Sequence, residues 1–99
     1  MDSGIWSGYM EKIREDPCVG PSHISLLAAI LFLHGLQGGG GQVYAFAHEL
    51  MSYAKISSTS TYVRCMTTLV RSRYIRYEAS FDPAVGSRIY LLNAGSDLF

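Results

Sequence analysis

The stretch ELMSYAKISSTSTYVRCMTTLVRSRYI, Glu49–Ile75, decides the fold because it joins two apolar-periodic segments through a polar turn. Five hydroxyl residues stand in a row there, from Ser57 to Thr61. Behind them, apolar residues recur at i, i+3, i+4 and i+7, which is the spacing of a helix that buries one face. The stretch therefore predicts a helix over Ser58–Ser72, with four residues directed inward: Tyr62, Cys65, Met66 and Leu69.

The line of this helix opposite its apolar face is polar and basic. It holds Ser60, Arg64, Thr67 and Arg71. Ser57 or Ser58 is expected to cap the helix, because a serine hydroxyl at that place accepts from a first-turn N–H group. The two arginines fit a binding surface, and they also fit the plain solvated face of an amphipathic helix.

Three further helices are predicted before this stretch. The first ends before Pro17, because the residue preceding a proline avoids the α region. Ser22 is the expected N-cap of the next helix, His23–Gln37, which is apolar nearly all round and is therefore expected to be the central buried helix. That helix ends at four consecutive glycines. The third lies within Gln42–Ile56.

The chain after the quoted stretch alternates like two strands joined by a turn. The predicted strands are Tyr74–Ser80 and Ser87–Leu92, and the predicted turn is Phe81–Gly86. The expected fold class is therefore mostly α with a small β-hairpin.

The quoted stretch resembles the helix-turn-helix core of winged-helix DNA-binding proteins. In that family a helix carrying Glu-Leu leads into an Ile-Ser turn, a second helix with Thr and an aromatic or β-branched residue, a Leu, and a Tyr-Ile that enters the wing hairpin. The hairpin matches RYEASFDPAVGSRIYLL, and the resemblance covers about Ser22–Leu92. More loosely, the chain is similar to small winged-helix proteins carried by bacterial mobile elements. The matching residues are Glu49, Leu50, Ala54, Ile56, Ser57, Thr61, Tyr62, Leu69, Tyr74 and Ile75.

The resemblance implies a winged helix-turn-helix fold that binds double-stranded DNA, with Ser58–Ser72 as the recognition helix in the major groove. Small hydroxyl residues let the backbone approach a phosphate at the positive end of a helix. Arg64 is placed to reach a base edge, and the other basic residues, Arg76 included, hold the phosphate backbone. The DNA-binding residues expected in this way are Lys55, Ser57, Ser58, Thr59, Ser60, Thr61, Arg64, Thr68, Arg71, Arg73 and Arg88.

Three features depart from the usual pattern of the family. Many members place a glycine just before the wing, where Arg73 stands here, and a non-glycine residue in the left-handed region carries a steric cost. The wing holds an acid, Asp82, and a single arginine, Arg88. After the central helix, where the family often has a short strand that joins the wing sheet, Val43 and Tyr44 are the candidates.

Composition sets the size and the charge of the domain. Its 99 residues suit one small domain, and 48% apolar residues supply a packed core. Net charge is zero, but residues 1–50 carry two Lys/Arg against five Asp/Glu and residues 51–99 carry six against three. The quoted stretch therefore lies mostly in a basic half. Two cysteines do not make a disulfide framework, so Cys18 is expected as a loop thiol and Cys65 as a core thiol in a reduced, cytoplasmic protein.

Several classes of function are not expected from this sequence. The longest apolar run is too short to span a bilayer, and the first residues do not have the pattern of a signal peptide. His23, His34 and His48 lack partners at metal-ligand spacing, so no metal and no cofactor is predicted. No catalytic set of residues stands out, so the protein is not expected to be an enzyme, and no small-molecule ligand is evident.

The expected organisation is an N-terminal helix and linker at 1–21, the winged-helix domain at 22–92 and a C-terminal tail at 93–99. The apolar residues of the N-terminal helix (Ile5, Trp6, Tyr9 and Ile13) exceed the needs of a small core, which predicts a homodimer through this arm. The expected function is transcriptional regulation. Two alternatives stay open: a winged-helix protein-interaction module that does not bind DNA, and an accessory factor of a mobile element.

Overall fold

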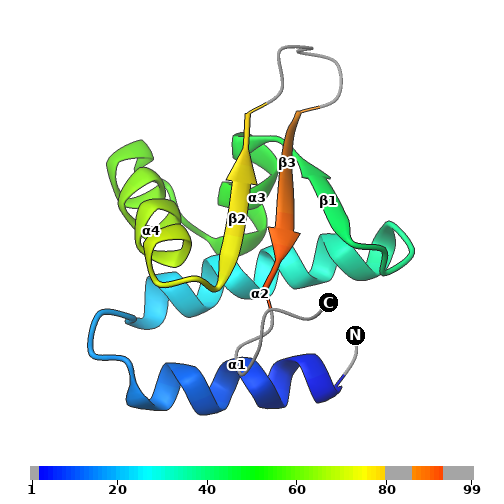
Figure 1. The fold of residues 1–99 in the computed structure, drawn as a ribbon. Helices are drawn as coiled ribbons and strands as arrows, with labels where there is room; N and C mark the ends of the chain where they lie inside the picture. The colour runs from blue at the N-terminus through cyan, green and yellow to red at the C-terminus, as the bar shows by residue number, and fades with distance from the viewer. Residues whose placement is uncertain (1–2, 80–85, 93–99) are drawn as a thin grey trace.

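The computed structural model describes residues 3–79 and 86–92, except for the side chains of residues 3 and 5. Four helices and a three-stranded antiparallel sheet form the described part, so the fold is mostly helical with a small sheet (Figure 1). The predicted turn at Phe81–Gly86, except for its last residue, and the tail at 93–99 lie outside the described residues. The elements are α1 (Ser3–Glu15), α2 (Pro21–Leu36), β1 (Gln42–Ala45), α3 (Ala47–Ala54), α4 (Thr59–Arg71), β2 (Ile75–Glu78) and β3 (Ser87–Leu91).

Helix α2 is the centre of the core, as its apolar sequence predicts. It crosses the molecule between α1 and the sheet (Figure 1). The prediction that Ser22 caps it is wrong: the helix begins two residues earlier than predicted, at Pro21, and Gly20 is the N-cap. Proline suits the first helical position because its fixed φ is already helical and its missing N–H has no partner there. The N–H of Gly20 donates to Nδ1 of His23 at 3.0 Å, which closes the turn. The buried residues of α2 are Leu26, Leu27, Ala29, Ile30, Leu31 and Leu33.

The sheet has a third strand in addition to the predicted hairpin. Strand β3 pairs with β2 on one side and with β1 on the other, so the spatial order is β1-β3-β2. The residues suggested for a short strand after the central helix, Val43 and Tyr44, lie in β1. The inward face carries the buried side chains of Val43, Ile75 and Ile89, which pack with α2 in a single core.

Helices α3 and α4 are joined by the polar turn that the sequence marks. Ser58 is the N-cap of α4, and its Oγ accepts from the N–H of Thr61 at 3.3 Å, so the predicted cap is confirmed. The predicted inward face is also confirmed, because the following four side chains are buried: Tyr62, Cys65, Met66 and Leu69.

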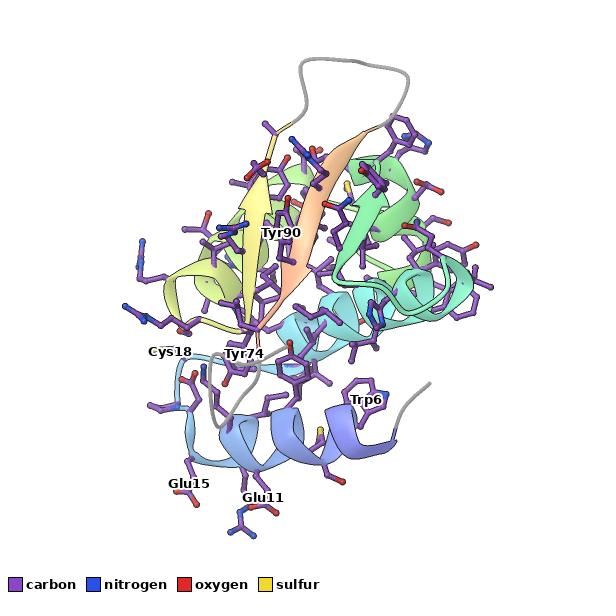
Figure 2. The ribbon with its side chains drawn as sticks, turned by 45° about the vertical axis from the view of Figure 1, so that its right-hand side comes forward. Trp6, Glu11, Glu15, Cys18, Tyr74 and Tyr90 are labelled. Carbon is purple, nitrogen blue, oxygen red and sulfur yellow. The ribbon has the colours of Figure 1, made fainter. Side chains whose placement is uncertain are left out.

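Helix α1 belongs to the same core, although it lies at the outer side of α2 (Figure 1). Tyr9 and Ile13 are buried within the protomer, and Trp6 packs against the core while Glu11 and Glu15 point away (Figure 2). Tyr9 and Ile13 are therefore not free surface for a second copy, which removes part of the basis for a dimer through this arm. None of the helices in residues 3–79 is both long and apolar enough to cross a bilayer.

A polar network fastens α1 to the start of β2. The hydroxyl of Tyr9 donates to the carbonyl of Tyr74 at 2.9 Å, and the hydroxyl of Tyr74 donates to Oδ2 of Asp16 at 2.9 Å. Lys12 completes the network: its Nζ lies 4.2 Å from the centre of the Tyr74 ring and donates to the carbonyl of Ser72. Three residues, Tyr9, Lys12 and Asp16, thus contact the turn between α4 and β2 and the residue that follows it.

Candidate nucleic-acid interface

The N-terminal end of α4 is open to solvent. Four of the five hydroxyl residues, from Ser57 to Ser60, are exposed, and Thr61 is half-buried. The first N–H groups of a helix have no partner within the helix, and the helix dipole adds partial positive charge at this end. Small hydroxyl side chains leave that end accessible. The structure therefore presents a polar, sterically open helix end of the kind that anions approach.

The outward line of α4 carries its charge. Arg64 and Arg71 are exposed and lie seven residues apart, so they point from the same side of the helix. Helix α4 has no aspartate or glutamate. Thr68, also expected at the interface, is half-buried, and its hydroxyl donates to the carbonyl of Arg64 at 3.0 Å, so its donor is used inside the helix.

The turns on both sides of α4 place a cation in a left-handed backbone conformation. Lys55, at the C-cap of α3, has φ 62°, and Arg73, between α4 and β2, has φ 63°. Arg73 therefore has the left-handed conformation, with its steric cost, that the sequence analysis considered for this position. Such a conformation costs a non-glycine residue roughly 1–2 kcal/mol. Both side chains are exposed, so α4 has a cation beside each end.

The cations of strands β2 and β3 have partners within the sheet. Arg88 forms an ion pair with Glu78 at 2.9 Å across β3 and β2, and Arg76 lies 4.2 Å over the ring of Tyr90, which is on the solvent face of the sheet (Figure 2). Both arginines were expected to contact DNA. Each of these two arginines already has a partner within the sheet, so they differ from the exposed cations in and beside α4.

Sequence reasoning missed an apolar groove between α4 and β2. Its volume is about 530 Å³, and Val63 and Val70 line it from α4 while Tyr77 lines it from β2. These three side chains are 53%, 37% and 40% exposed. The sequence contains only one wall of the groove, since two valines seven residues apart share one flank of a helix, whereas the opposing Tyr77 is brought there by the fold.

Burial raises the pKa of the Cys65 thiol, which is the core thiol that the sequence predicts, whereas Cys18 is exposed in the loop before α2. Within residues 3–79 and 86–92, no three His, Cys, Asp or Glu side chains gather at a distance that would hold a metal ion.

Comparison with protein-family models, with curated proteins and with solved structures finds no match for this chain.

Proposed function

We propose that this protein is a winged-helix DNA-binding protein that places α4 in the major groove of a duplex. One observation carries the proposal: α4 has an open, hydroxyl-rich N-terminal end and four exposed cations along its length, and none of these forms an ion pair with another described residue. Lys55 precedes the helix, Arg64 lies in its second turn, and Arg71 and Arg73 lie at its C-terminal end. Guanidinium and ammonium groups that have no carboxylate partner within the protein are available to phosphates.

Each part of this surface has its own task in the proposed complex. The hydroxyl groups of Ser57 to Ser60 and the first N–H groups of α4 contact a phosphate, which fixes the register of the helix on the duplex. Arg64, one turn into the helix, donates two hydrogen bonds to the edge of a guanine. Lys55, Arg71 and Arg73 hold the phosphate backbone around it.

The wing contributes less to this interface than the recognition helix. The ion pair of Arg88 with Glu78 must be broken, or shared, before Arg88 serves a phosphate. As part of the same proposal, the protein acts as a transcriptional regulator and binds as a homodimer, because symmetric regulators read two half-sites about one helical turn apart.

The test is a titration of fluorescein-labelled duplexes at about 50 and 200 mM salt, first with an arbitrary sequence and then with a site selected from random duplexes. We expect Arg64→Ala to weaken the selected site about tenfold or more, with a smaller effect on arbitrary DNA. Arg71→Ala is expected to weaken binding to the selected site and to arbitrary DNA alike, and to reduce the salt dependence of that binding.

The matched control is Arg14→Ala. Arg14 is an exposed arginine of α1 whose guanidinium lies 3.9 and 3.7 Å from Glu11 and Glu15. Its loss changes net charge by the same amount as Arg64→Ala, yet it should leave DNA affinity unchanged. Absence of binding to any duplex at the lower salt concentration would remove the proposal.

A further inference from the structure

The two outer strands of the sheet, β1 and β2, differ in the bonding of the backbone N–H and carbonyl groups that point away from β3. On β1, the N–H of Tyr44 donates to Oε1 of Gln37 at 2.9 Å, and the carbonyl of Tyr44 accepts from Nε2 of Gln37 at 2.7 Å. The side-chain amide thus takes the place that a neighbouring strand would fill. Covering an edge in this way prevents another chain from pairing with it.

On β2 the corresponding groups are open. The N–H of Leu92 donates to the carbonyl of Tyr74 at 3.0 Å, and Tyr77 stands opposite Ile89 in the antiparallel register. Because hydrogen-bonded and non-hydrogen-bonded pairs alternate along such a ladder, the N–H and carbonyl of Tyr77 point away from β3. Within the described residues, no hydrogen bond reaches these two groups.

The open edge borders the apolar groove. Val63, Met66 and Val70 form its α4 wall, and Tyr77 forms its β2 wall. Two helical turns separate Val63 from Val70, which is about 10 Å along the helix. Alternate side chains of an extended strand lie about 7 Å apart. Two side chains on one face of a strand therefore fit along this wall.

Charge selects the partner. Among the residues that the structure describes, Arg71 is the charged residue that lines the groove, and no aspartate or glutamate lines it. We propose that this groove binds an extended peptide with acidic ends and alternating apolar residues. The peptide pairs its backbone with Tyr77 as a fourth strand and lays its apolar side chains against α4. Strand addition beside a helix is a general mode of peptide recognition, in which backbone bonds supply affinity and the groove supplies specificity.

The inference does not depend on DNA binding. Arg71 belongs to both surfaces, but the residues that identify each one differ: Ser60 and Arg64 lie on the line of α4 opposite the core, and Val63 and Val70 lie on the flank beside β2. Peptide and duplex titrations therefore fail or succeed separately.

The test uses labelled peptides of the form Glu-X-Thr-X-Thr-Glu, with X as valine, leucine or phenylalanine, added to the full chain. In the proposed pairing, the X residues face the groove and also turn their N–H groups toward the outer edge of β2, where one of them donates to the carbonyl of Tyr77. N-methylation of both X residues should weaken binding about tenfold or more, because two strand bonds are lost. N-methylation of both threonines, whose N–H groups point away, should leave binding unchanged.

A pair of acidic variants tests the groove itself. Val70→Asp places an acid in the groove and should weaken peptide binding about tenfold. Met10→Asp introduces the same charge at an exposed apolar residue of α1, outside the groove, and should have little effect.

Three results would overturn the proposal: none of the peptides binds, both methylated forms bind alike, or lysine at the ends serves as well as glutamate. A chain that sediments as a dimer with its Tyr77 amide already protected from exchange would overturn it too, because a second copy would then occupy the edge.

Discussion

The two edge strands of the sheet differ in how their outward backbone N–H and carbonyl groups are bonded. At β1, Gln37 reaches across seven residues and satisfies both backbone groups of Tyr44. At β2, the backbone of Tyr77 lies beside an apolar groove, and no side chain of the described residues covers it in this way. An unpaired edge invites association with other chains, and small proteins usually blunt it. The difference between the two edges is the basis for proposing a peptide site on the β2 side, next to α4.

The support behind the two edges differs as well. The start of β2 is tied to α1 through the hydroxyls of Tyr9 and Tyr74, whereas β1 depends on a close backbone approach near Gly86. The β2 side is thus held by side chains that titrate, and the β1 side by steric fit. Alkaline pH should therefore destabilise the β2 side, and added side-chain volume should destabilise the β1 side.

Alkaline pH should have the largest effect, and it should act on the β2 side. Burial raises the pKa of the Tyr9 hydroxyl and of the Tyr74 hydroxyl, the latter also through its hydrogen bond to Asp16, and burial raises the pKa of Tyr62 to about 12. Unfolded tyrosine ionises near pH 10. Since the folded pKa values are higher, the stabilisation is complete below pH 10 and is lost as the pH rises toward the folded values.

Urea unfolding between about pH 8 and 11.5 measures this loss. Tyr9→Phe is the control. Its free energy of unfolding should be lower by about 1 kcal/mol at pH 8 and should fall less than that of the wild type as the pH rises. A free energy of unfolding that stays constant over this range would contradict the role given to the tyrosines.

Gly86→Ala should damage the β1 side. Gly86 has φ 73°, and a Cβ there would lie 2.7 Å from the carbonyl oxygen of Ala45. The left-handed conformation and the overlap together should cost about 2–4 kcal/mol in the free energy of unfolding. Gly40→Ala is the control, because nothing lies within 4 Å of its added Cβ. Equal stability of the two variants would contradict the close approach.

Gln37→Ala should turn the covered edge into an open one. The loss of two hydrogen bonds should cost about 1 kcal/mol, and the amide of Tyr44 should exchange with solvent as fast as that of Tyr77. Gln37→Glu keeps the acceptor for the Tyr44 N–H and loses the donor to the Tyr44 carbonyl. Its Tyr44 amide should therefore exchange at a rate between those of the wild type and Gln37→Ala. If the exchange rate of Tyr44 does not respond, the side-chain amide does not cover the edge.

Arg73→Gly should have the smallest effect, and it should be stabilising. Glycine removes the cost of the left-handed φ of 63° but loses more backbone freedom on folding, so the net gain should be below about 1 kcal/mol. Arg73→Ala removes the same charge and keeps the strain. Thermal unfolding should therefore rank Arg73→Gly above Arg73→Ala, and the reverse order would show that this turn is not strained.

The sequence predicts α4 closely because its signals are local and agree with one another. The buried line from Tyr62 to Leu69 and the cap at Ser58 both lie within one continuous segment. The predicted cap at Ser22 is wrong because Pro21 favours the first helical position, so α2 begins there and Gly20 is its N-cap.

The groove and the two edges could not be predicted in the same way. Strand β1 has four residues beside a run of glycines, and its pairing depends on β3, more than forty residues later. The cover on Tyr44 depends on the path of the chain through those glycines. Val63 and Val70 form a groove only because Tyr77 stands opposite them. Such features arise from tertiary contacts, which local patterns do not contain.

The most direct test of the proposed function is a titration of duplex DNA into the ¹⁵N-labelled chain, with the amide shift of every residue followed at low salt. The account predicts the largest changes at Ser57 to Thr61 and at Arg64, with Tyr44 and its neighbours unaffected. Changes confined to other surfaces, or no change at any amide, would contradict the assignment of α4 to DNA.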